Sequence, residues 1–242
     1  TVGGDAMLAV TDSDLSIDAP IHVTDGTLFL DVFGDVDQSE QGTITASGLG
    51  LMVGGTTMLP LANDVDTLAA DTDGTIYFND VDGLTVGTVT ESASDSDMSL
   101  TGILTANTTD TGYDVKLAVA EDLLITEAID LGSEGNLFLS VIGEVNQSGQ
   151  GTITASGLAL MVGGDTKLPL ANDIDVLAAD TDGTIYFNDV DGLTVGTVTE
   201  SASDSDMSLT GIHTAITTDT GYDVKLSVGE NLLITEAIDL GI

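Results

Sequence analysis

The sequence predicts an all-β protein, and within that class a β-solenoid whose short strands stack in parallel along one axis. Three observations support this prediction. The chain repeats itself with a period of 109 residues, apolar residues alternate over short runs bounded by Gly, Asn or Asp, and no apolar series keeps helical spacing for long. Residues 41–132 return as residues 150–241 with ten differences in 92 positions and no insertion or deletion.

The repeat divides the chain into three parts. Residues 1–40 are the tail of a divergent preceding repeat, because "GTLFLDVFGDVDQSEQG" from Gly26 parallels "GNLFLSVIGEVNQSGQG" from Gly135. Residues 41–149 form copy one, and residues 150–242 form copy two, which is truncated. No linker-like seam interrupts the period, so we expect one continuous solenoid that is a window from a longer array.

Short alternating runs predict the strands. In chain order these runs are "GTIYFND" at 74–80, "LTVGTV" at 84–89, "DVKLAV" at 114–119 and "GNLFLSV" at 135–141. In the third run, Val115, Leu117 and Val119 point to one face of the strand. Lys116 and Ala118 point to the other face. Each run therefore has one face that can be buried against a core.

Two architectures can house such a repeat: a β-solenoid or tandem β-sandwich domains. Aromatic residues make up only 4% of the chain and Trp is absent, whereas sandwich cores depend on large aromatics. The apolar segments recur at a sub-period, near Leu137, Leu160, Tyr186, Leu209 and Leu226. About five coils of roughly 22 residues then fill one repeat, which rises about 24 Å at about 4.8 Å per coil. These observations favour the solenoid.

The charge of the chain excludes several partners. There are 41 Asp and Glu residues against three Lys and Arg, for a net charge of −38. Nucleic acids and anionic membrane surfaces are excluded, because both bind through Lys and Arg. No apolar run is long enough to span a bilayer, and Cys is absent. Such a charge needs salt or bound cations to screen it, which predicts an extracellular or cell-surface location.

Four stretches of alternating strand and turn residues resemble known repeats: "TDGTIYFNDVDGLTVGTVT", "NDVDTLAA", "GNLFLSVIGEVNQSGQGTITASGLALMV" and "LLITEAIDLG". They are similar to the repeats of giant bacterial surface proteins related to filamentous hemagglutinin, and the resemblance covers nearly the whole chain. It implies a right-handed parallel β-helix in a secreted adhesin or fibre-like shaft. It carries over no active site, since the motifs are strand-and-turn patterns.

Two acidic turn motifs are the candidate metal sites. They are "DTDG" and "NDVDG", and each occurs once in either copy. Alternate carboxylates before a Gly turn offer the oxygen ligands that Ca²⁺ prefers, although turn formation alone explains the same residues. The candidate ligands are Asp71, Asp73, Asp80, Asp82, Asp180, Asp182, Asp189 and Asp191. Asp95 and Asp97 are expected at a corner of the neighbouring coil, 24 residues after Asp71 and Asp73.

The residues argue against an enzyme. A lyase acting on acidic polysaccharides needs a base and cations, yet only Lys116, Lys167 and Lys225 are available. Asp80 and Asp82 could serve as the acid and base of a glycoside hydrolase, but this spacing is commoner in turns. His213 stands where copy one has Leu104, so a catalytic histidine would be missing from one copy.

We therefore expect a structural shaft or fibre-forming segment of a repetitive, secreted bacterial surface protein. Its partners would be neighbouring repeats of the same chain and further copies, joined end to end or laterally, because cut solenoid ends expose open strand edges. The alternative is a calcium-dependent, glycan- or cell-binding module built from tandem sandwiches.

Overall fold

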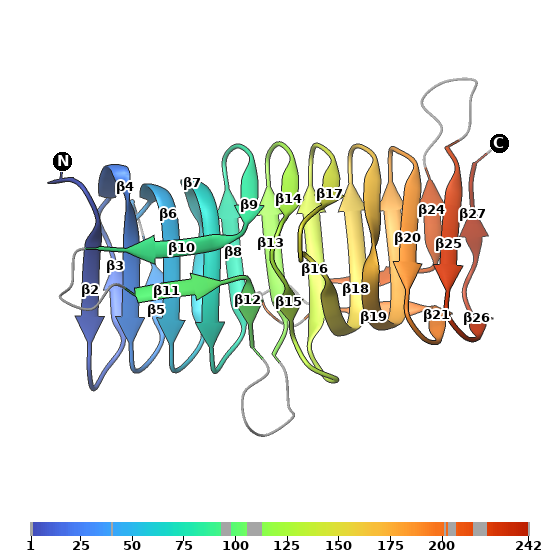
Figure 1. The fold of residues 1–242 in the computed structure, drawn as a ribbon, viewed down its shortest axis with the longest axis horizontal. Helices are drawn as coiled ribbons and strands as arrows, with labels where there is room; N and C mark the ends of the chain where they lie inside the picture. The colour runs from blue at the N-terminus through green and yellow to red at the C-terminus, as the bar shows by residue number, and fades with distance from the viewer. Residues whose placement is uncertain are drawn as a thin grey trace.

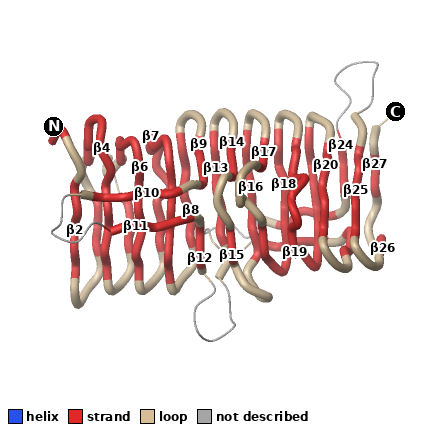
Figure 2. Tube along the Cα trace, viewed as in Figure 1, coloured by secondary structure: helices blue, strands red, loops and turns tan. Residues whose placement is uncertain are grey.

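The computed structural model of the chain is a β-solenoid built from parallel, stacked strands (Figure 1). It describes residues 2–39, 41–92, 98–105, 113–200, 202, 207–214 and 222–241. These residues contain strands and turns but no helix, and so none that could cross a membrane (Figure 2). The predicted all-β solenoid is confirmed, and the alternative of tandem sandwiches is wrong, because parallel pairing runs from coil to coil through both copies.

One 23-stranded sheet winds through the described residues, accompanied by two two-stranded hairpins. Before and within copy one the strands are β1 (Val2–Gly3), β2 (Ala6–Val10), β3 (Leu15–Ile17), β4 (Ile21–Val32), β5 (Val36–Gln38), β6 (Ile44–Val53), β7 (Thr57–Thr72), β8 (Ile76–Asp80), β9 (Leu84–Val86), β10 (Thr88–Glu91), β11 (Met98–Thr101), β12 (Ile103–Leu104), β13 (Val115–Val119), β14 (Leu123–Ile125), β15 (Ile129–Asp130), β16 (Asn136–Val141) and β17 (Val145–Gln147). Copy two continues with β18 (Ile153–Val162), β19 (Thr166–Thr181), β20 (Ile185–Asp189), β21 (Leu193–Val195), β22 (Thr197–Thr199), β23 (Ser208–Thr210), β24 (Ile212–Thr214), β25 (Val224–Val228), β26 (Leu232–Ile234) and β27 (Ile238–Asp239).

Each coil crosses two faces, and every half-turn pairs in parallel with its neighbours on the same face. The first face consists of residues 6–10, 28–32, 49–53, 68–72, 84–86 with 103–104, 123–130, 145–155, 166–174, 185–189 and 224–228. The second face consists of residues 15–23, 36–46, 57–65, 76–80, 115–119, 137–141, 158–162, 177–181, 193–195 with 212–214, and 232–239. Both ladders run the length of the molecule.

The sequence repeat contains an odd number of half-turns. Between residues 49–53 and their counterparts 158–162, the described chain makes nine of them, which is four and a half coils. The predicted five coils per repeat are therefore nearly correct. Because of the extra half coil, residues that lie on the first face in one copy lie on the second face in the next. Successive copies are thus presented on opposite sides of the solenoid.

The core lies between the two faces and is continuous. Alternate side chains of each strand point inward and stack on their counterparts one coil away, as Leu28, Leu49 and Leu68 do. All three are fully buried. Two phenylalanines, Phe78 and Phe187, fill the interior at equivalent positions of the two copies. A coil exposes half of this apolar surface when it stands alone, so each coil is stabilised by its neighbours.

Tight corners join the faces, and backbone contacts between consecutive coils select small residues there. A Cβ on Gly42 would overlap the carbonyl oxygen of Ile17 in the coil below. Acidic corner residues link the coils as well. Asp14 accepts a hydrogen bond from the N–H of Asp35 at 2.9 Å, and Asp35 accepts one from the N–H of Thr56 at 2.7 Å. The corners therefore stack in register with the strands.

Two antiparallel hairpins lie across the outside of the solenoid, and we call them the first strap (β10 and β11) and the second strap (β22 and β23) (Figure 1). The predicted strand at 84–89 is interrupted at Gly87, where the chain leaves the sheet to form the first strap. It re-enters at Gly102, which has a positive φ of 70° and donates to the carbonyl of Gly87 at 2.8 Å. Strap residues Val89, Met98 and Leu100 pack against outward side chains of earlier coils, among them Phe29 and Ala69.

The second strap repeats this arrangement on the opposite face. Val198, Met207 and Leu209 cover an outward row that includes Phe138 and Ala178. Each strap thus folds back over coils that precede it in the chain. The outer surface of both straps carries cross-strand hydroxyl pairs, with oxygen–oxygen distances of 3.0–3.2 Å.

Candidate functional site

The structure separates the two predicted acidic motifs. Asp71 lies on the outside of the first face, and Asp73 begins the adjoining corner. Asp80 points into the protein at the end of β8, with 1% of its surface exposed, and Asp82 lies in the following corner. The two corners lie at opposite edges of the solenoid (Figure 1). The predicted metal ligands therefore form two different environments in each copy.

Asp80 is a buried carboxyl group held by the backbone. Its Oδ2 accepts a hydrogen bond from the N–H of Val65 at 3.0 Å, and its Oδ1 accepts one from the N–H of Asp82 at 3.2 Å. The side chains of Asp80 and Asp82 also interact with each other. Oδ1 of Asp82 is buried, and within the described part of the chain no N–H or O–H group donates to it. A proton on Asp80 would supply that donor.

Burial changes the acidity of this carboxyl group. Desolvation, followed by the hydrogen bond to Asp82, raises the pKa of Asp80 to about 7. In copy two, burial raises the pKa of Asp189 to about 6, with Ile174 and Asp191 taking the places of Val65 and Asp82. Each copy thus contains a carboxyl pair that binds a proton near neutral pH.

A buried amide network adjoins each carboxyl pair, and the sequence analysis did not identify it. Oδ1 of Asn63 accepts hydrogen bonds from Nε2 of Gln38 at 2.6 Å and from the N–H of Ile44 at 2.9 Å. Nδ2 of Asn63 donates to the carbonyls of Leu61 and Asn79, both at 3.0 Å. Copy two repeats the network through Gln147 and Asn172. A polar residue at an inward position in both copies was the signal that could have revealed it.

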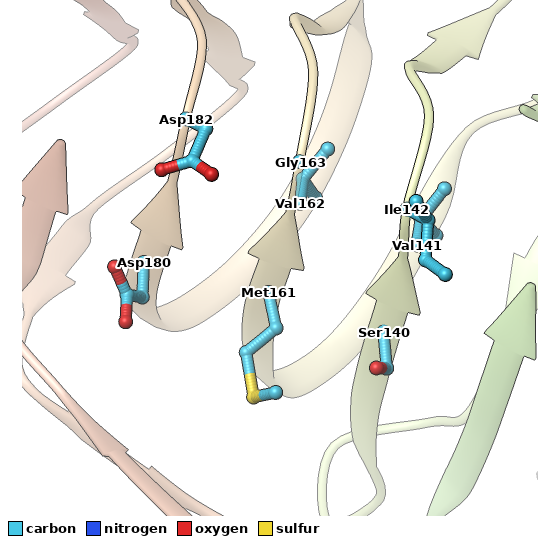
Figure 3. A pocket seen from close by; sticks show the side chains of 8 residues that line it. All are labelled: Ser140, Val141, Ile142, Met161, Val162, Gly163, Asp180 and Asp182. Atoms are coloured by element: carbon cyan, nitrogen blue, oxygen red, sulfur yellow. The ribbon is translucent and has the colours of Figure 1, made fainter. Parts of the chain in front are cut away.

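The other pair of each copy borders a shallow groove on the outside. Figure 3 shows the groove of copy two, in which Ser140, Met161 and Asp180 lie on adjacent strands and Asp182 begins the corner. The groove holds about 320 Å³. Its counterpart in copy one holds about 270 Å³ and lies on the opposite face, with Asp71 and Asp73 in the same places.

A substitution on the strand next to Asp180 adds a histidine beside the groove of copy two. In copy two, Nδ1 of His213 lies 3.0 Å from Oδ1 of Asp180, whereas copy one has Leu104 at the equivalent position. The hydrogen bond to Asp180 raises the pKa of His213, and the nearby charges of Asp180, Asp239 and Asp182 act in the same direction. His213 is thus paired with a carboxylate that borders the groove of copy two.

Calcium binding by these aspartates stays a prediction. Among the residues that the structure describes, no three acidic or histidine side chains are grouped so that they could hold a metal ion. The proposed neighbours Asp95 and Asp97 lie outside the described residues. The Asp80–Asp82 pair and the Asp189–Asp191 pair each offer two carboxylates with backbone groups nearby, which is an incomplete ligand set for Ca²⁺.

A second cluster of charges joins the two copies. Lys116 points outward from β13, as predicted, but the second strap covers it so that only 7% of its surface is exposed. Its Nζ lies 3.5 Å from Oε2 of Glu200, which is fully buried, and 4.9 Å from the ring centre of Tyr77. Burial, followed by the charge of Glu200, raises the pKa of Tyr77. Sequence reasoning could not find this contact, because 84 residues separate Lys116 from Glu200.

Comparison with protein-family models, curated proteins and solved structures gives no match to this chain. The parallel β-solenoid implied by the resemblance to filamentous hemagglutinin repeats is present in the structure. Membership of that family stays a prediction.

The carboxyl pairs make stability depend on pH. Because folding raises the pKa of Asp80 from 3.8 to about 7, its contribution to stability is complete below pH 4 and is lost as the pH rises through 7. We expect the melting temperature of the unchanged chain to fall between pH 5 and pH 8, and Asp80→Asn to remove roughly 5 °C of that fall, because Asn does not titrate. Only the pH dependence is compared, since Asn has one acceptor oxygen for the two backbone N–H groups and is expected to lower stability at both pH values. Asp66→Asn is the exposed control. A fall as steep in Asp80→Asn as in the unchanged chain would contradict this assignment.

The ion pair between the copies is expected to stabilise the second strap. Lys116→Met leaves the Glu200 carboxylate buried without its ammonium partner and should lower the free energy of unfolding by about 3 kcal/mol. Met occupies the equivalent position 7, so the change is compatible with the fold. Lys225→Met is the matched control, because Lys225 is exposed although it contacts Tyr186 in the same way. Denaturant unfolding measures both variants, and equal effects would refute the stabilising role of the Lys116–Glu200 ion pair.

Proposed function

We propose that this chain is a stiff structural shaft within a repetitive, secreted bacterial surface protein. The observation that carries the proposal is the continuity of the solenoid: two parallel ladders and one apolar core extend through both copies without a hinge in the described residues. Stacked coils resist bending because any bend must separate hydrogen-bonded strands on one side. A shaft of this kind holds other parts of a protein away from a surface.

The contact between copies supports the same proposal. The second strap starts in copy two and ends over Lys116 of copy one, so its ion pair and its apolar face connect coils that are distant in sequence. A mechanical force along the solenoid axis would thus act on the strand ladders, the core and the second strap together. The surface location is supported by the charge of −38, which requires screening by salt or bound cations. Adhesive activity, by contrast, depends on the family resemblance alone.

Stiffness can be measured directly, because the chain has no cysteine and accepts spin labels at chosen positions. Ala9→Cys and Ser227→Cys lie on the first face nine coils apart, which corresponds to about 43 Å. We expect electron–electron double resonance to give one narrow distance distribution near that value. The reference for the width of that distance distribution is the pair Asp31→Cys and Asp130→Cys, which lie four coils apart on the same face. A distribution much broader than the reference would show a hinge and contradict the shaft.

Calcium is the candidate ligand that would stabilise such a shaft outside the cell. We expect a calcium-specific rise in melting temperature at pH 8, beyond that given by sodium chloride of matched ionic strength, with EDTA as the baseline. The rise should shrink at pH 5, where protons occupy the buried carboxyl pairs, and in the variant Asp80→Asn/Asp189→Asn. A calcium effect equal to that of matched salt would show that these aspartates form turns and do not bind metal.

A further inference from the structure

Each strap is a two-stranded sheet whose two strands lie over different parts of the face beneath it. The chain enters the second strap from Val195, which pairs with Leu177. It leaves the strap to Ile212, which pairs with Ala179. β23 is therefore the strand on the side of Asp180, and β22 lies on the other side. The first strap is placed in the same way on its own face, with β11 on the side of the groove.

The outer edge of β10 and of β22 is covered by a side chain of the solenoid, and we call it the capped edge. Nδ2 of Asn136 donates a hydrogen bond to the carbonyl of Thr199 at 3.3 Å. Thr27 stands at the equivalent position ahead of copy one, and its Oγ1 donates to the carbonyl of Thr90 at 3.1 Å. One edge of each strap is thus closed by the same device.

The opposite edge of each strap, formed by β11 (Met98–Thr101) or β23 (Ser208–Thr210), directs backbone groups outward, and we call it the free edge. Gly211 donates to the carbonyl of Gly196 at 2.8 Å, so this pair hydrogen-bonds across the hairpin. Such pairs alternate in an antiparallel ladder, and the N–H and C=O groups of Ser208 and Thr210 therefore point away from β22. β11 has the same pattern, and among the described residues neither strand has a second neighbouring strand.

The free edge of the second strap lies next to the groove of copy two (Figure 3). The floor of this groove is the outward row Ser140, Met161 and Asp180, two residues beyond the row that the strap covers. Its far side is the corner, where Ile142 is 72% exposed. A smaller hollow of about 130 Å³ continues the groove past Ala118. A strand edge thus runs along a channel with an apolar and acidic floor.

The groove of copy one has the same construction and a higher negative charge. Asp31, Met52 and Asp71 form its floor, and Phe33, which is 70% exposed, lies at its corner. Copy two has Ser140 in place of Asp31. Exposed apolar surface and carboxylates therefore lie side by side next to both free edges, with one more carboxylate in copy one.

We propose that each free edge binds an extended, basic segment of another protein, which adds to the strap as a third, antiparallel strand and lies over the groove. A strand edge recognises a peptide through its backbone, and the floor selects the side chains. Alternate side chains of the added strand point toward the solenoid, where Lys or Arg would place its alkyl part on Met161 and its charge beside Asp180. A second copy of this chain is a poor occupant, because 41 acidic residues accompany only three Lys and Arg residues.

The two binding edges lie on opposite faces, because the straps do. One molecule would therefore hold two peptide segments on opposite sides. This activity is separate from the proposed shaft, which requires only stacking within the molecule.

The probe is a fluorescein-labelled, end-capped peptide, Thr-Lys-Thr-Lys-Thr-Lys-Thr, whose binding to the full chain is followed by fluorescence anisotropy. In the proposed strand the Lys residues face the groove, and the Thr residues exchange backbone hydrogen bonds with the free edge. N-methylation of the inner two Thr residues removes donors that the strap uses. N-methylation of the first two Lys residues leaves those donors in place and keeps the same charge and mass.

Proline variants make the same comparison on the protein. Ser99→Pro with Ser208→Pro removes an outward N–H from each free edge. Thr90→Pro with Thr199→Pro removes one from each capped edge and is the matched control, because Thr90 pairs with Ser99 and Thr199 with Ser208. Proline is tolerated at such positions of an edge strand, and the melting temperature checks the fold of each variant.

We expect two peptides to bind per chain. The free-edge variant, and the peptide methylated on Thr, should each weaken binding about tenfold, and their matched controls less than threefold. Asp71→Asn with Asp180→Asn should weaken binding about threefold, whereas Asp66→Asn with Asp175→Asn, on the far side of the straps, should not.

Absence of binding, or equal losses from the two methylated peptides, would overturn the proposal. Equal losses from the two proline variants would overturn it as well, because they would show attraction to the acidic surface without strand pairing. The comparison of methylated peptides uses the unchanged chain and stands even if a proline variant does not fold. Each of these failures would leave the narrow spin-label distance, and hence the shaft, unaffected.

Discussion

The in-register stacking of each half-turn on the one below is the constraint on which the rest of this structure depends. Parallel pairing satisfies the backbone groups of a strand only if a strand of matching length lies on either side. It also places equivalent residues directly above one another, so that side chains form columns through the molecule. Apolar columns build the core, and the corner aspartates accept hydrogen bonds from backbone N–H groups of the next corner. Even the straps depend on this order, because they lie on outward columns of apolar and small residues.

Buried polar groups are tolerated for the same reason. Gln38, Asn63 and Asp80 follow one another on consecutive coils of the second face, so each polar side chain finds a partner in the coil next to it. A polar residue introduced into one coil alone would lose such partners and would cost the free energy of desolvation. The repeat therefore preserves polar positions together with their neighbours.

The sequence was sufficient to predict the solenoid because its evidence is local and repeated. Alternation in runs such as residues 114–119 predicts a strand with one buried face, and the short sub-period predicts stacking. The straps could not be predicted in this way. Val89 and Leu100 alternate as core residues do, and a hairpin that buries one side against the outside of a sheet has the same pattern as a strand in it. The acidic motifs are ambiguous for a related reason, since an inward Asp80 and an outward Asp71 both precede turns.

The differences between the copies show how so acidic a chain uses its few cationic groups. Copy one has Thr56 and Met58 at a corner where copy two has Asp165 and Lys167, whose side chains lie 3.1 Å apart. The hydrogen bond from Lys167 contributes to a lowered pKa of Asp165, after that from the N–H of Thr184. Lys167 is thus introduced together with one of its carboxylate partners, and it also lies 3.4 Å from Glu144. His213 lies beside Asp180, a carboxylate that copy one also has, as Asp71. Each substitution places a basic side chain next to a carboxylate without altering the strands.

The half coil in each repeat has a consequence for the shape of a long array. A strap adds mass and contacts to only one side of the solenoid, and an asymmetric load of this kind favours curvature toward or away from that side. Because the next copy is turned to the opposite side, its strap favours curvature in the reverse sense. If further copies followed in the same way, paired copies would oppose each other's bend, and such an array would stay straight on average although no single repeat is symmetric.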